Sequence, residues 1–268
     1  MYNYDMMLAD LKNLTNARIF SLGKTLFGRE IFAIIVGVGN PKTLIHGGIH
    51  GRENITSRLV VRQARVYSGS AVCFVPMVNP DGVQLAELGL KSAPQNMRKF
   101  LTKANGDGDF KLWKANGRAV DINVNFNADW GNGLFNANIP SFENYIGKMP
   151  ESEVETKALI ELTKIYKFKV SASYHAKGEV IYCGFQDKFP YMSEAMEISN
   201  LTGYPLLQSL GSAGGFKDWF VLNNYGLGLT IEVGDDRLAH PLQESAFAKV
   251  WRDNKEVAKK LCEIGERI

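Results

Sequence analysis

Stretches with apolar residues at helical spacing alternate along the chain with short runs that are almost wholly apolar. Met7, Leu8, Leu11 and Leu14 predict an amphipathic helix over residues 5–15. The run AVCFVPMV at 71–78 has no polar position, so it predicts a strand covered on both faces. Other predicted strands lie near residues 17–22 and 29–37, joined through a turn at Gly28, and at 42–47, 169–175, 178–183 and 226–234. Other predicted helices cover Asn54–Val66 and residues 150–166, 189–202 and 242–266, and a glycine loop leads into another helix within residues 211–225.

Residues 91–120 are polar and are predicted to be irregular. The sequence NPDG at 79–82 predicts a turn at the end of the apolar strand. We find no internal repeat and no linker-like stretch. The alternation of strands and helices therefore predicts an α/β fold, with a single sheet covered by helices on both faces and one domain over residues 1–268.

Composition narrows the class of protein only slightly. The 268 residues carry a net charge of +3 without a basic block, which gives little support for nucleic-acid binding. Three widely spaced cysteines in apolar settings predict buried thiols in a reducing compartment. No stretch is long enough to span a bilayer and the N-terminus lacks a signal-peptide pattern. We expect a cytoplasmic protein that does not bind membranes, with an export signal removed from this chain as the alternative.

Two of the four histidines stand where predicted strands end, which is where open α/β sheets place their active sites. His50 follows a strand and a glycine pair, and Glu53 lies three residues later, on the same side of a helical turn. His175 stands at the end of another predicted strand, directly after Val170–Tyr174. Together they form a two-histidine, one-glutamate set for zinc that leaves a position open for water. Either histidine could instead be structural; His46 is predicted to be a bystander, and His240 a loop residue.

Glu232 lies inside the otherwise apolar run GLGLTIEVG. A buried carboxylate must be paired, protonated or beside a cation, since burying an isolated charge is costly. The residue is either a salt-bridge partner in the core or a general base beside a metal.

The segment WKANGRAVDINVNFNADW carries further groups that suit such a site. Asp121 could accept the second ring N–H of a metal-bound histidine. Lys114 or Arg118 could stabilise an oxyanion. The alternative for this segment is an Asn/Asp-rich loop that makes local turns.

In their order along the chain these segments resemble the zinc metallocarboxypeptidases, the M14 peptidases. GGIHGRE is similar to the first zinc motif of that family, VDINVNF to its V-D-x-N-R-N-F segment, and SYH to the strand of the third ligand. TIEVG is similar to its catalytic-glutamate strand and GGFKDWF to the segment of the specificity pocket. The resemblance covers nearly the whole chain and implies a mixed, twisted central sheet of about eight strands.

The same resemblance implies roles for particular residues. His50, Glu53 and His175 would bind one Zn²⁺ per chain, and Glu232 would be the general base. Asp121 would hold the first zinc histidine. Arg52 and Asn123 would contact substrate, Asn123 at a substrate carboxylate.

Three departures from the family pattern bear on the substrate. The arginine that usually follows the asparagine is Val124, so the usual anchor for a C-terminal carboxylate is missing. The oxyanion-stabilising arginine falls on Lys114, with Arg118 as the alternative. The tyrosine of the digestive enzymes falls on Leu210, and the bottom of the specificity pocket falls on Lys217, which suits a substrate with a carboxylate-bearing side chain.

These features resemble the branch of γ-D-glutamyl-meso-diaminopimelate peptidases, and WKAN and GGFKDWF carry that likeness. We therefore expect a peptidase that acts on small peptides or muropeptides derived from peptidoglycan. A conventional metallocarboxypeptidase, an N-acyl amino acid deacylase and an inactive peptide-binding relative are the alternatives. The sequence leaves the oligomeric state open.

Overall fold

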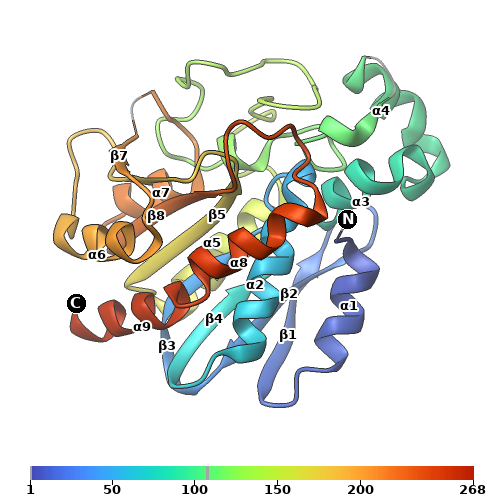
Figure 1. Cartoon of the computed structure of the whole chain (residues 1–268). Coiled ribbons are helices and arrows are strands. Elements are labelled where there is room, and N and C mark those ends of the chain that lie inside the picture. Colours follow the sequence, from blue (N-terminus) through green and yellow to red (C-terminus); the bar gives the residue numbers. More distant parts are fainter. Residues whose placement is uncertain (1, 107–108, 210) are drawn as a thin grey trace.

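The computed structural model describes residues 2–106, 109–209 and 211–268, and over these residues eight strands form one mixed sheet (Figure 1). Across the sheet the strand order is β1-β2-β4-β3-β5-β8-β6-β7. The four central strands β4, β3, β5 and β8 run parallel to one another, so their carboxyl ends meet at one edge. The strands are β1 Ala17–Lys24, β2 Glu30–Val36, β3 Val38–His46, β4 Ser70–Val75, β5 Val170–Ala176, β6 Val180–Cys183, β7 Leu206–Gln208 and β8 Leu227–Val233.

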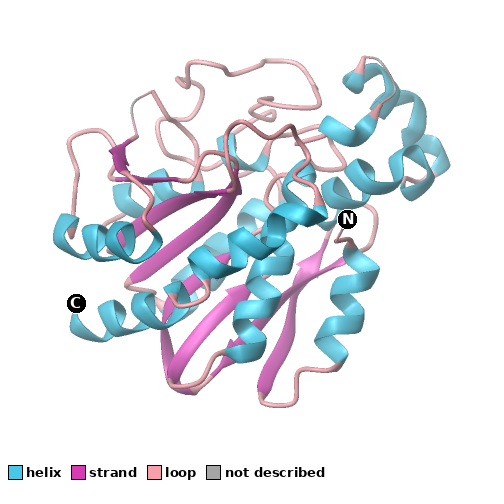
Figure 2. Cartoon of the chain, viewed as in Figure 1, coloured by secondary structure: helices cyan, strands magenta, loops and turns pink. Residues whose placement is uncertain are grey.

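Helices cover both faces of this sheet, as Figure 2 shows. Apolar residues of α1, α2, α6, α8 and α9 form one core with the sheet, and those of α5 and α7 form a second core on the opposite face. A smaller cluster under α3 and α4 includes Trp113. The predicted α/β fold with a single mixed sheet is therefore confirmed. The helices are α1 Tyr4–Lys12, α2 Asn54–Val66, α3 Pro80–Leu88, α4 Arg98–Asn105, α5 Val154–Tyr166, α6 Met192–Thr202, α7 Phe216–Leu222, α8 Phe247–Asn254 and α9 Val257–Arg267.

Several predicted elements were wrong in kind or extent. The strand predicted through Val78 ends at Val75, and NPDG starts α3 because the Asn79 side chain caps the helix by accepting from the backbone N–H of Gly82. Residues 91–120 were predicted to be irregular, but they contain α4. The predicted helix over 242–266 is two helices, α8 and α9. They part at Asn254, whose carbonyl accepts a hydrogen bond from Gln63.

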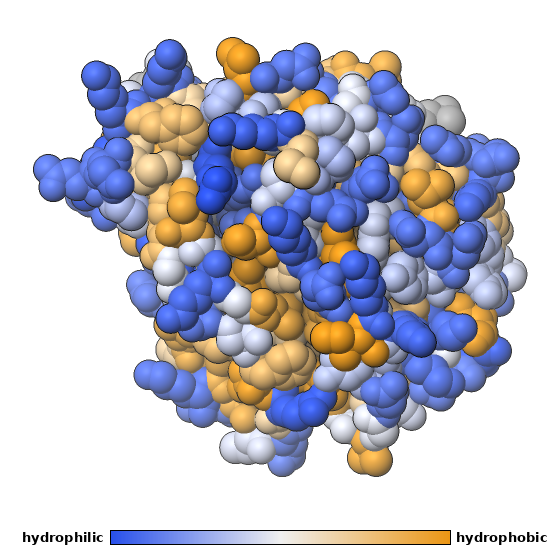
Figure 3. All heavy atoms as spheres, turned by 180° about the vertical axis from the view of Figure 1, so that it is seen from behind, coloured by the Kyte–Doolittle hydropathy of each residue, from blue (hydrophilic) through white to orange (hydrophobic). Residues whose placement is uncertain are grey.

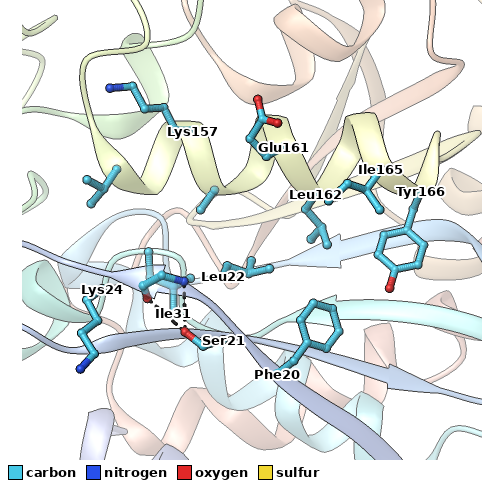
Figure 4. A pocket seen from close by; sticks show the side chains of 13 residues that line it. Phe20, Ser21, Leu22, Lys24, Ile31, Lys157, Glu161, Leu162, Ile165 and Tyr166 are labelled. Carbon is cyan, nitrogen blue, oxygen red and sulfur yellow. Dashed lines mark hydrogen bonds between the residues drawn. The ribbon is translucent and has the colours of Figure 1, made fainter.

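The face seen from behind carries apolar side chains among the charged ones (Figure 3). One hollow of about 550 Å³ lies there between the edge strand β1 and α5, where Phe20 and Leu22 face Leu162, Ile165 and Tyr166 (Figure 4). None of the predicted site residues lines this groove. No helix among the described residues is both long and apolar enough to cross a membrane.

Candidate metal centre

The predicted metal-binding residues meet at the carboxyl ends of the parallel strands. His50 follows β3, His175 is the penultimate residue of β5, and Glu232 is the penultimate residue of β8. His175 and Glu232 are direct partners in the β5–β8 pairing. Neighbouring parallel strands therefore bring together groups that are separated by up to 182 residues in the chain, as open α/β sheets commonly do at their active sites.

Two glycines allow the chain to turn tightly between β3 and α2. Gly48 has φ +61°, which L side chains rarely adopt, and a Cβ there would lie 2.3 Å from the Ser57 hydroxyl. A Cβ on Gly51 would lie 2.4 Å from the carbonyl oxygen of Gly82. A side chain at either position would therefore force the loop that presents His50 to shift.

Three donor groups converge in this buried space. The Nδ1 atoms of His50 and His175 are 3.1 Å apart. Glu53 places Oε1 2.9 Å from the first and Oε2 3.2 Å from the second of these nitrogens. The three side chains are at most 5% exposed, and over the described residues they form a group whose ligand atoms all lie within 4.8 Å of one another. Two imidazole nitrogens and a carboxylate are the ligand set of catalytic zinc sites.

The outer ring nitrogens of both histidines have other partners. Nε2 of His50 lies 3.2 Å from Oδ1 of Asp121, and Nε2 of His175 lies 3.0 Å from the Ser173 hydroxyl. An outer partner that accepts a hydrogen bond from Nε2–H holds the ring in the tautomer whose Nδ1 is unprotonated and free to bind a metal. The residues present therefore fit a zinc ion. Ser173 was not anticipated from the sequence, although its position two residues before His175 places it on the same face of the strand.

Lys114 and Asp121 form a partly buried ion pair beside this group. Nζ of Lys114 lies 3.0 Å from Oδ2 of Asp121, which is fully buried. Burial alone would raise the pKa of the Asp121 carboxyl, but the charges of Lys114 and His50 outweigh burial and lower that pKa. Burial likewise opposes the charged form of Lys114, and the carboxylates of Asp121 and Glu53 raise its pKa. Both groups are therefore ionised at neutral pH, which places a fixed cation near the metal ligands.

Glu232 has a different environment. Burial, followed by the negative charge of Glu53, raises the pKa of its carboxyl well above the ordinary value. A carboxyl with a raised pKa suits a general base that must take up a proton near neutral pH.

Arg118 lies away from the ligand group. Its side chain is 60% exposed and its guanidinium Nε is 3.9 Å from Glu153, a residue just before α5. Of the two cations left open as oxyanion-stabilising candidates, only Lys114 lies beside Asp121 and the ligands.

Residues 5–257 match the protein family described as zinc carboxypeptidase, Peptidase_M14. The chain belongs to the zinc carboxypeptidase family. It is thus a metallopeptidase by family, and the family is zinc-dependent.

Individual relatives and solved structures give more specific similarities. The chain is 30% identical to gamma-D-glutamyl-L-diamino acid endopeptidase 1 of Lysinibacillus sphaericus, over 94% of this chain and 70% of that protein. Its fold is similar to bovine thrombin-activatable fibrinolysis inhibitor, with a TM-score of 0.76 at 19% identity over 98% of this chain and 95% of that one. It is also similar to murein-tripeptide amidase MpaA of Escherichia coli O157, with a TM-score of 0.63 at 24% identity over 91% and 98% of the two chains.

The residues expected to contact substrate form ion pairs or hydrogen bonds with other residues of the protein. Arg52 lies 3.2 Å from the carboxylate of Glu143. Oδ1 of Asn123 accepts from the backbone N–H of Phe216 at the start of α7. Lys217 is 4% exposed and donates to Oδ1 of Asp218 and to the carbonyl of Gly184, both at 2.5 Å.

Two of three further residues singled out by their sequence positions lie in the part of the chain that the structure describes. Val124 packs against Gly214, whose added Cβ would be 2.6 Å from the Val124 carbonyl oxygen. Leu210 lies outside the described residues. His46 is fully buried and contributes no atom to the ligand group; its ring packs edge-on against Phe216, with centroids 4.7 Å apart.

Proposed function

We propose that the chain is a zinc-dependent peptidase that hydrolyses γ-D-glutamyl–diamino acid bonds, including those to meso-diaminopimelate, in peptidoglycan-derived peptides. The observation that carries the catalytic part is the convergence of His50, Glu53 and His175, with Glu232 in register beside them. The substrate part rests on the similarity to the Lysinibacillus endopeptidase over 94% of the chain, and on Val124 and Lys217.

Each residue has one role in this proposal. Zn²⁺ held by His50, Glu53 and His175 would supply the Lewis acidity that polarises the scissile carbonyl and activates water. Glu232 takes the proton from that water and passes it to the leaving amine. Lys114 stabilises the oxyanion as a fixed positive charge. Asp121 and Ser173 keep the two histidines in the tautomer that binds metal.

Lys217 sets the preference for a diamino acid with a second carboxylate. Its ammonium has three N–H groups, and two of them are used by Asp218 and Gly184. The third has no acceptor among the residues that the structure describes, and it would donate to a carboxylate at the end of the substrate side chain. Asn123 and Arg52 bind other polar groups of the peptide. Val124 cannot pair with a free C-terminal carboxylate. The contact between Lys217 and the side-chain carboxylate therefore takes over part of the anchoring of the substrate.

The test compares two substrates on the zinc-loaded protein. L-Ala-γ-D-Glu-meso-diaminopimelate and an ordinary peptide with a free C-terminal Phe are incubated separately, and the products are identified by mass spectrometry. We expect cleavage after γ-D-Glu, loss of activity in Glu232→Gln, and a lower kcat/KM for the diaminopimelate peptide in Lys217→Met. Release of C-terminal Phe without cleavage of the γ-D-Glu bond would instead identify a conventional carboxypeptidase.

A further inference from the structure

The segment Phe142–Tyr145 contacts several charged residues of the site, although the sequence pattern did not single it out. The Phe142 carbonyl accepts from the backbone N–H groups of Lys114 and Ala115, each at 2.9 Å. The Tyr145 carbonyl accepts from the N–H of Asp121 at 2.9 Å. These bonds hold both parts of the loop that carries Lys114 and Asp121 against one short segment.

Asn144 makes the decisive contacts of this segment. Its backbone N–H donates to Oδ2 of Asp121 at 3.1 Å, and its Oδ1 accepts from Nζ of Lys114 at 3.3 Å. The same Oδ2 of Asp121 lies 3.0 Å from Nζ of Lys114, so the three groups close a triangle. Asn144 has φ +61°, a left-handed conformation that asparagine tolerates better than most residues with a side chain.

The Lys114 ammonium needs a second hydrogen-bond acceptor to fix its direction, for a physical reason. A lysine is a point charge on a flexible four-carbon stem, and it lacks the rigid fork with which arginine fixes its own direction. With Asp121 alone, the ammonium could rotate about a single carboxylate oxygen. With Asp121 and Asn144 together, two of its three N–H groups are directed. The direction of the third N–H then follows from the tetrahedral geometry of the nitrogen.

We propose that Asn144 is a positioning residue that aims the third N–H of Lys114 at the reacting carbonyl oxygen. This inference rests on the proposed function, because it needs Lys114 to stabilise an oxyanion. It predicts that Asn144 acts on turnover rather than on substrate affinity, since the contact matters most when charge develops on the oxygen.

The variant Asn144→Gly tests the inference directly. Glycine keeps the left-handed backbone and the N–H to Asp121, and it removes the side chain with the Oδ1 that accepts from Lys114. We expect kcat to fall about 30-fold, which is less than the loss of a whole oxyanion donor, with KM within about threefold of the unmodified value. Zn²⁺ affinity, measured by chelator competition, should be unchanged, since the Asp121–His50 contact is kept.

The chain offers a closely matched control. Asn224 also has a left-handed φ of +58°, and its Oδ1 accepts from a lysine ammonium, that of Lys188, at 3.2 Å in the turn after α7. Asn224→Gly removes the same kind of contact outside the site, and it should leave kcat and KM unchanged.

Two further measurements separate positioning from a general structural role. In a double-mutant cycle, Asn144→Gly should cause no further loss of kcat in a Lys114→Met background, because both changes remove the same contact. Equal losses in both backgrounds, or a drop in Zn²⁺ affinity in Asn144→Gly, would overturn the inference. In the metal-free protein, ¹⁵N NMR of the Lys114 ammonium, assigned from its absence in Lys114→Met, should show faster proton exchange in Asn144→Gly.

The outcomes distinguish this inference from the proposed function. If the unmodified zinc-loaded chain cleaves the γ-D-Glu bond and Asn144→Gly keeps its full kcat, the positioning role is wrong and the proposed function stands. If the unmodified chain does not cleave that bond, the proposed function is wrong. The inference fails with it as a statement about catalysis, even if the NMR measurement still detects the contact.

Discussion

Glu155 is a carboxylic acid in the first turn of α5 that is only 1% exposed. Its Oε2 accepts from the Asn116 side chain at 3.2 Å, and the same amide donates to Glu153 at 2.8 Å. Burial, followed by the negative charges of Glu153 and Asp81, raises the pKa of Glu155 from 4.5 to about 8. The folded protein therefore holds a proton here at neutral pH that the unfolded chain has lost.

The sign of the resulting pH dependence follows from this difference. Between pH 4.5 and 8 the folded state binds more protons than the unfolded state, so the free energy of unfolding falls as the pH rises. One pH unit corresponds to about 1.4 kcal/mol. From pH 4.5 to pH 7 the loss is thus about 3 kcal/mol, and the loss is complete near pH 8.

Glu155→Gln replaces the protonated acid by a neutral group of the same shape that can still accept from Asn116. We expect the variant to be about 3 kcal/mol more stable than the unmodified chain at pH 7, with the advantage shrinking to nearly zero near pH 4.5. Urea unfolding at pH 5, 6, 7 and 8 measures the difference in unfolding free energy between the variant and the unmodified chain. Other titrating groups affect both proteins equally, so their contributions cancel in this difference.

A second glutamate of the same helix serves as the control. Glu161→Gln changes a side chain of α5 that is 64% exposed, and it should shift the unfolding free energy by less than about 0.5 kcal/mol at every pH. If the curves of Glu155→Gln and the unmodified chain run parallel between pH 5 and pH 8, Glu155 is ionised in the folded state and the reasoning is wrong.

Two other substitutions test how the loop and the core are built. Gly51→Ala should destabilise the fold by about 1–3 kcal/mol and weaken Zn²⁺ binding, because its Cβ would meet the Gly82 carbonyl. Thermal unfolding and chelator competition measure the two effects. As the control, Gly203→Asn, at φ +75° with open space around it, should change neither stability nor Zn²⁺ binding. Arg29→Met leaves the fully buried Asp81 without its 2.6 Å partner, so urea unfolding should show a loss of about 3–5 kcal/mol. Adding Asp81→Leu to Arg29→Met should recover most of that loss, and a loss under 1 kcal/mol in Arg29→Met would contradict the importance of this pair.

Local pattern was sufficient for much of the fold. The apolar spacing in Asn54–Val66 predicted α2 to the residue, because an amphipathic helix repeats its pattern over several turns. It was insufficient for β7, whose three residues are too few for a period to be recognised. It also missed the break after α8, because the hydrogen bond from Gln63 to the Asn254 carbonyl comes from a helix 191 residues earlier.

The site divides in the same way. By itself the sequence determined which ligand types are present and in what local order, since the three-residue spacing of His50 and Glu53 and the strand before His175 are short-range features. Only the tertiary structure decided that Lys114 lies beside Asp121 while Arg118 points to Glu153, and that Asn144 joins Lys114 to Asp121. These choices depend on contacts between loops distant in the chain, where the direction of a side chain is set by packing and hydrogen bonds rather than by its own neighbours.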